Sequence, residues 1–142
     1  LNSGNAVVQA PHRAAATLAA AVAAALEAQF GFHVPVIVVP ATSLAQVVSE
    51  CPFAHEATDH SRLLVSFAQD PALLRQVQSV AALVAPPERW AIGSAAAYLL
   101  CASGILESKA ANALLGKAGV LVTSRNWATV LKLHALATNS AA

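Results

Sequence analysis

The sequence predicts an α+β protein, because helix-like and strand-like patterns follow one another along its 142 residues. Three stretches give the strongest signals: residues 11–30 carry apolar side chains at helical spacing, residues 62–67 alternate as in a strand, and residues 90–100 resemble a β-hairpin around Gly93-Ser94. This length suits one domain, or two small subdomains that share a core.

Composition excludes several classes of protein. Much of the 57% hydrophobic content is alanine, and the longest strongly apolar run, residues 14–26, is shorter than the ~20 residues of a membrane span. We therefore expect no transmembrane helix and no membrane partner. Cys51 and Cys101 lie far apart, without metal-ligand spacing, so the sequence predicts no disulfide framework, metal or cofactor, and a reduced cytoplasmic location.

Charge is distributed unevenly along the chain. Residues 1–88 contain three basic and six acidic side chains, a net charge of −3, whereas residues 89–142 contain five basic and one acidic side chain, a net charge of +4. Such a division favours an anionic partner for the second part. The alternative is that the basic part faces the acidic part of its own chain.

In the first part, we expect a strand at residues 5–9 after a turn at Ser3-Gly4-Asn5, a helix at residues 11–30 and a strand at residues 33–39. Pro11 suits the first turn of this helix, and Gly31 is the expected left-handed terminator. The predicted core stripe of the helix is Leu18, Val22, Leu26 and Phe30.

The second part is expected to alternate helices and strands. Residues 43–51 and 71–84 are predicted helices, the latter capped by Asp70 with Leu73, Val77, Val80 and Val84 inward. Between them, residues 53–61 form a polar loop in which metal binding is less favoured than a solvated connector, and residues 62–67 form a half-buried strand. After the hairpin, we expect a helix at residues 106–118, a strand at residues 120–123 and a last helix starting near Ser124 or Asn126.

Two stretches could bind an anion. The first is the start of the predicted helix at 106–118, and the second is the start of the last helix, where an arginine fork could hold a phosphate or carboxylate and an indole could shape the pocket. The candidate ligand-binding residues are Ser108, Lys109, Arg125, Asn126, Trp127 and Lys132. The alternatives are that Ser108 and Asn126 are helix caps, Trp127 is a core anchor, and the cations are solvated or ion-paired.

Several short motifs occur in a recognisable order. They are Ser3-Gly4-Asn5, Cys51-Pro52-Phe53, Tyr98-Leu99, Gly104-Ile105 with Ser108-Lys109, and Arg125-Asn126-Trp127 with Thr129-Val130 and Lys132-Leu133. Together they resemble a bacterial family known as domain of unknown function 1697. The resemblance implies an α+β protein of two parts: a variant ferredoxin-like subdomain ending at residue 41, and a second small α/β subdomain over residues 42–142. It also implies that the family's opening strand and helix, which would come before Leu1, are missing from this chain.

No motif in the sequence specifies a reaction, and the family's biochemical role is not established. We consider a binding module for a phosphate-bearing or carboxylate ligand first. An enzyme using the same pocket is second, with His134 as the candidate acid or base. A structural protein that associates with itself as a homo-oligomer is third. A nucleotide would suit the first hypothesis, whereas no motif supports nucleic acid.

Overall fold

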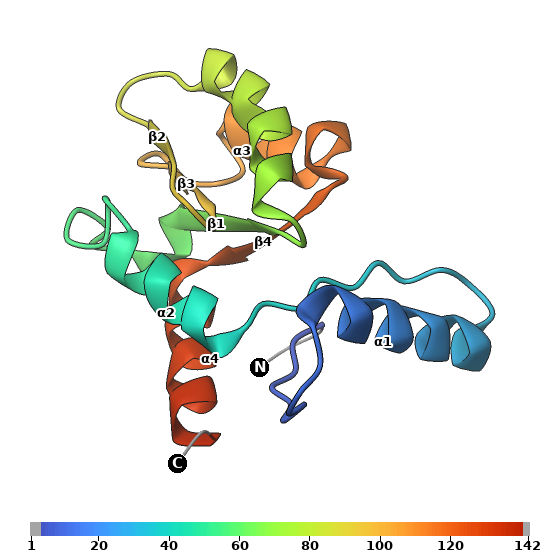
Figure 1. Cartoon of the computed structure of the whole chain (residues 1–142). Coiled ribbons are helices and arrows are strands. Elements are labelled where there is room, and N and C mark those ends of the chain that lie inside the picture. The colour runs from blue at the N-terminus through green and yellow to red at the C-terminus, as the bar shows by residue number, and fades with distance from the viewer. Residues whose placement is uncertain (1–3, 141–142) are drawn as a thin grey trace.

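The computed structural model describes residues 4–140. Leu1 and Ser3, which belong to motifs named in the sequence analysis, lie outside this part of the chain. A four-stranded antiparallel sheet lies at the centre, with helices on both of its faces (Figure 1). The described chain combines helices with this sheet, so the α+β class is confirmed.

The sheet is formed by β1 (Leu63–Ala68), β2 (Arg89–Ile92), β3 (Ala97–Leu100) and β4 (Val122–Asn126), in the order β2-β3-β1-β4. β1 is central and pairs with both β3 and β4. All six of its residues are buried, because helices cover both faces of the sheet, so the expectation of a half-buried strand is wrong. The predicted hairpin is confirmed as the β2–β3 pair.

One face of the sheet, called face A here, is covered by α2 (Ala41–Glu50) and α4 (Trp127–Ser140). The predicted helix at 43–51 is confirmed, with Leu44 and Val47 buried. Tyr98 crosses this layer, and its hydroxyl donates a hydrogen bond of 2.9 Å to the Val47 carbonyl oxygen. Trp127 and Val130 fix α4 to the same core, as expected from the sequence.

The opposite face, face B, is covered by the 3₁₀ helix η2 (Pro71–Leu83) and by α3 (Lys109–Leu115). Asp70 caps η2 by accepting the Ala72 N–H, as predicted, but the helix is not α-helical. Its buried side chains are Leu74, Val77 and Val80, a three-residue spacing that puts them on one side of a 3₁₀ helix. Val77 and Val80 are thus buried as predicted, Leu73 and Val84 are only partly buried against the same core, and Leu74 is a buried residue that the sequence analysis missed.

The elements that follow also start later than predicted. Ser108 caps α3, so the helix begins at Lys109 and leaves Leu106 87% exposed. The short 3₁₀ helix η3 (Lys117–Gly119) comes next, and the strand predicted at 120–123 is displaced to β4. A further 3₁₀ turn, η1 (His60–Arg62), leads into β1.

The first helix, α1 (Ala15–Phe30), extends away from the sheet (Figure 1). It starts four residues after Pro11, because residues 11–12 form a turn in which His12 has a φ of 64°. Its end at Gly31, with a φ of 78°, is confirmed. The predicted core stripe is wrong: Ala19 is the buried residue of this helix, while Val22 and Phe30 are 37% and 56% exposed.

The two strands predicted on either side of α1 are not formed in the described chain. Residues 5–9 and 33–39 are irregular, and no sheet ladder includes them. Part of the second segment is instead bound by one side chain: Gln69 accepts the Val38 N–H at 2.8 Å and donates to the Val38 carbonyl oxygen at 3.1 Å. Val38 and Asn5 therefore contact the sheet region without extending the sheet.

Candidate functional site

Arg125 lies near the end of β4, not at the start of a helix as the sequence analysis assumed. It pairs with Val65 across the ladder, so its side chain shares face A with Val65 and Thr123. Residues 4–10, called the N-terminal arm here, reach this edge of the sheet. The arginine therefore joins two segments that are about as far apart in sequence as the chain allows.

Four neutral oxygen atoms hold the half-buried guanidinium. Nε donates to Asn5 Oδ1 at 2.7 Å, and Nη2 donates to the Gly4 carbonyl oxygen at 3.2 Å. On the other side, Nη1 donates to Thr123 Oγ1 at 2.7 Å and to the Ser124 carbonyl oxygen at 2.8 Å. None of the ion pairs found among residues 4–140 involves Arg125. The guanidinium is thus held in place, and no carboxylate among the described residues forms an ion pair with it.

The neighbours of Arg125 in the sequence have structural tasks. Asn126 caps α4, since its Oδ1 accepts the Thr129 N–H at 2.9 Å. Trp127 is 3% exposed and belongs to the core on face A. Lys132 lies on the exposed side of α4. The structural interpretation is thereby confirmed for Asn126 and Trp127, and Arg125 and Lys132 are left as groups that could meet a ligand.

Ser108 and Lys109 lie on the other side of the sheet. Ser108 is buried, caps α3 through the Ala111 N–H at 3.0 Å, and hydrogen-bonds the Cys101 thiol. Burial raises the pKa of Cys101 to about 11, so this thiol stays protonated at neutral pH. Because α3 packs on face B, whereas Arg125 points to face A, the structure does not bring the two predicted anion sites together.

The acidic side chains of residues 1–88 all have local partners, whereas most basic side chains after them do not. Each acid accepts a hydrogen bond or forms an ion pair; the pairs are Glu27 with His33, Glu50 with Ser94, Glu56 with Arg89, Asp59 with Arg62, Asp70 with Ala72, and Glu88 with Ala85. In the described chain no ion pair includes the cations after Arg89, which are Lys109, Lys117, Arg125 and Lys132. Only Arg89 supports the alternative that the basic part faces the acidic part.

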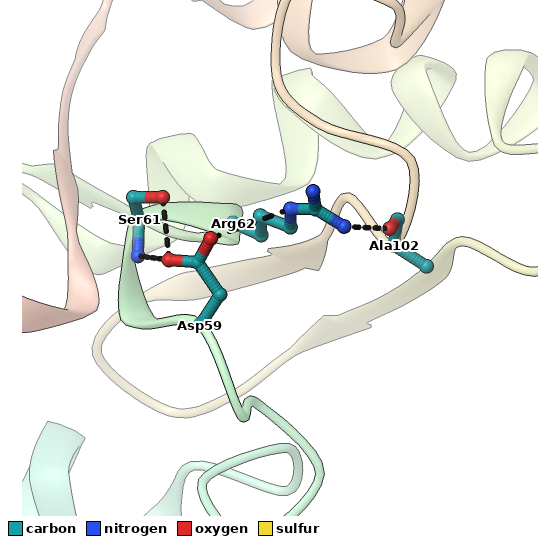
Figure 2. Close-up of polar contacts among 4 residues, drawn as sticks. All are labelled: Asp59, Ser61, Arg62 and Ala102. Carbon is teal, nitrogen blue, oxygen red and sulfur yellow. Dashed lines mark hydrogen bonds and ion pairs between the residues drawn. The ribbon is translucent and has the colours of Figure 1, made fainter.

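Figure 2 shows the polar contacts around Arg62, which sequence reasoning missed. Asp59 Oδ1 accepts both the N–H and the hydroxyl of Ser61, and these bonds lower the pKa of the Asp59 carboxyl group. Arg62 lies 3.5 Å from Asp59 Oδ2 and donates to the Ala102 carbonyl oxygen at 2.7 Å. The cluster borders a cavity of about 120 Å³, and it fastens the predicted polar loop to the segment after β3.

His134, the candidate acid or base of the enzyme hypothesis, is remote from Arg125. It lies seven residues after Trp127 on α4, which corresponds to about 10 Å along the helix axis. Its Nδ1 is buried and has no hydrogen-bond partner in the structure as described. No titratable side chain among residues 4–140 therefore contacts the guanidinium as a general acid or base would.

Fold and site together define an α+β protein in which a single arginine connects a sheet edge to an N-terminal arm. The chain belongs to the family described as "Protein of unknown function (DUF1697)", which matches residues 1–98. This match includes Gly4 and Asn5 and ends before Ser108 and Arg125. No curated protein matches the chain, and no solved structure matches it. No helix within residues 4–140 is long and apolar enough to cross a membrane.

Proposed function

We propose that this protein is a binding module for a small anionic ligand, a phosphate or a carboxylate, with Arg125 at the centre of the site. The observation that carries the proposal is the fixed guanidinium whose four described acceptors are all neutral. A charged donor forms its strongest hydrogen bonds with anionic oxygens, and holding its planar fork in advance reduces the entropy lost on binding.

The surrounding charge supports the same proposal. Residues 108–142 contain four lysine or arginine side chains and no aspartate or glutamate. Their summed field attracts anions towards this part of the surface, and exposed Lys132 contributes to it without fixed geometry. Self-association through oppositely charged ends is less favoured, because the acids of the first part already have local partners.

The remaining candidate residues act indirectly in this proposal. Asn126 and Trp127 hold α4 against β4 and so fix the strand end that carries Arg125. Ser108 and Lys109 lie on face B, where Lys109 adds only to the long-range field. The alternative of an enzyme that uses the same pocket would need a proton-transfer group close to Arg125. The cytoplasmic location and the ferredoxin-like arrangement of the first part stay predictions.

The test is the affinity for inorganic phosphate, measured by titration of the amide resonances at constant ionic strength. Arg125→Lys keeps the charge but removes the planar fork, and we expect it to weaken phosphate binding about tenfold. Arg75→Lys is the matched control, since Arg75 is exposed on η2 and its side chain has no hydrogen bond or ion pair within the described chain. Equal affinities of the two variants would contradict the proposal, as would a failure of phosphate, acetate and nucleoside monophosphates to bind.

A further inference from the structure

The two sides of the Arg125 guanidinium are held by different parts of the chain. On one side, Thr123 and Ser124 accept from Nη1 within β4 itself. On the other side, Nε and the neighbouring Nη2 direct two parallel N–H bonds at Asn5 Oδ1 and the Gly4 carbonyl oxygen. This Nε–Nη2 side is the fork that binds the two oxygens of a carboxylate or phosphate bidentately. The N-terminal arm thus supplies two oxygens where an oxyanion would supply its own.

We propose that the N-terminal arm is a built-in competitor for the anion, and that a ligand with two oxygens on one carbon or phosphorus atom displaces Gly4 and Asn5 from Arg125. This inference rests on the proposed function. It adds the geometry of the ligand, which is bidentate, and the response of the protein, which is release of the arm from the fork.

The contacts differ in how easily a ligand could replace them. The bond from Nη2 to Gly4 is the longest of the four, and it is exposed. Gly4 presents its carbonyl oxygen from a left-handed backbone with a φ of 81°, a conformation that side chains other than that of glycine rarely allow. Both oxygens from the arm are neutral, so an anion gains the full charge interaction by replacing them. The strand-side bonds need not change, and the guanidinium therefore stays in position during the exchange.

The ligand class follows from the fork. Carboxylates and phosphate monoesters present two oxygens with the spacing of the two parallel N–H bonds, so each oxygen accepts one straight bond. A monatomic anion has to share one atom between both bonds. We therefore expect acetate and inorganic phosphate to shift the Gly4 amide resonance at saturation. Chloride at equal ionic strength should shift that resonance much less. Comparing the affinities for acetate and phosphate then shows whether the site prefers a carboxylate or a phosphate.

Two substitutions at Asn5 are expected to change the affinity for phosphate in opposite directions. Asn5→Ala removes the acceptor that competes for Nε, so we expect phosphate to bind about fivefold more tightly. Asn5→Asp places a carboxylate in the fork permanently, and we expect it to weaken phosphate binding tenfold or more. Asn139→Ala is the control, because Asn139 is exposed on α4 and its side chain has no hydrogen bond in the described chain.

The outcomes separate this inference from the proposed function. If Asn5→Ala weakens phosphate binding, Asn5 is a positioning residue for Arg125, and competition is overturned. Unchanged affinities in both Asn5 variants would also overturn it, and anion binding would stand if Arg125→Lys still lost affinity. An absence of phosphate binding in the unaltered protein removes both proposals. A Gly4 resonance that moves equally with chloride and phosphate contradicts the bidentate ligand.

Discussion

Residues 41–140 and residues 4–40 contain similar strand patterns, but only the first region forms a sheet. Residues 33–39 contain five β-branched side chains and β1 contains one, yet residues 33–39 lie outside every ladder of the described chain. The difference shows that a strand-like sequence makes a segment suitable for a sheet but does not by itself place the segment in one. Its backbone N–H and C=O groups also need a partner strand in register, and β1 has two of them.

The helices of the two regions repeat this contrast. α4 buries Trp127 and Val130 against the sheet, whereas α1 leaves Val22 and Phe30 of its apolar stripe exposed. At the end of α1, Phe30 stacks on Phe32, with ring centroids 6.0 Å apart. An amphipathic helix therefore gains most of its stabilisation only where another surface receives its apolar face.

The largest effect expected from this contrast is on stability. Tyr98→Ala should lower the free energy of unfolding by about 3–5 kcal/mol, because it leaves a cavity on face A and removes the hydrogen bond to Val47. Phe30→Ala, in the exposed part of α1, should change it by less than about 0.5 kcal/mol. Chemical denaturation of both variants gives the comparison. Similar losses would show that α1 is as well packed as the sheet.

The second effect is the pH dependence of stability that arises from Glu50, in residues 41–140. Glu50 at the end of α2 accepts hydrogen bonds from Ser94 and Gln46, and these bonds lower the pKa of its carboxyl group below 4.5. A lowered folded-state pKa stabilises the protein above the unfolded-state pKa, and this contribution is lost as the pH falls through the folded-state value. Glu50→Gln should therefore be less stable than the unaltered protein at about pH 7, and the difference should shrink as the pH falls below 4.5, as measured in urea. A constant difference across this range would contradict the assignment.

The smallest effect is chemical and leaves stability unaltered. Burial raises the pKa of Cys51, and it raises the pKa of Cys101 to about 11, so both thiols in the larger region are protonated and enclosed. At about pH 8 we expect each to react with an aromatic disulfide reagent about a hundredfold more slowly than in the denatured protein. Absorbance of the released thiolate measures the rate. Rapid reaction of either thiol in the native state would show that this region opens.

Sequence reasoning located part of the site. It selected Arg125 because a guanidinium fork suits an oxyanion, and it gave the capping of Asn126 and the burial of Trp127 as alternatives that the structure confirms. It missed that Gly4, Asn5 and Thr123 hold the guanidinium. Gly4 and Asn5 lie about 120 residues before Arg125, and no pattern of spacing connects them. The opposite placement of Ser108 and Arg125 was equally invisible, because it depends on which face each segment covers.

The sequence by itself determined the local structure of this protein. Turn and cap residues such as Asp70 and Gly31 act within a few positions of the chain, so their effects are readable in order. It also determined the excess of cations without acids over residues 108–142. Only the tertiary structure decided which strand patterns became strands and which cations stayed unpaired. Ladders and ion pairs depend on partners that are distant in sequence, and the fold alone brings such partners within bonding distance.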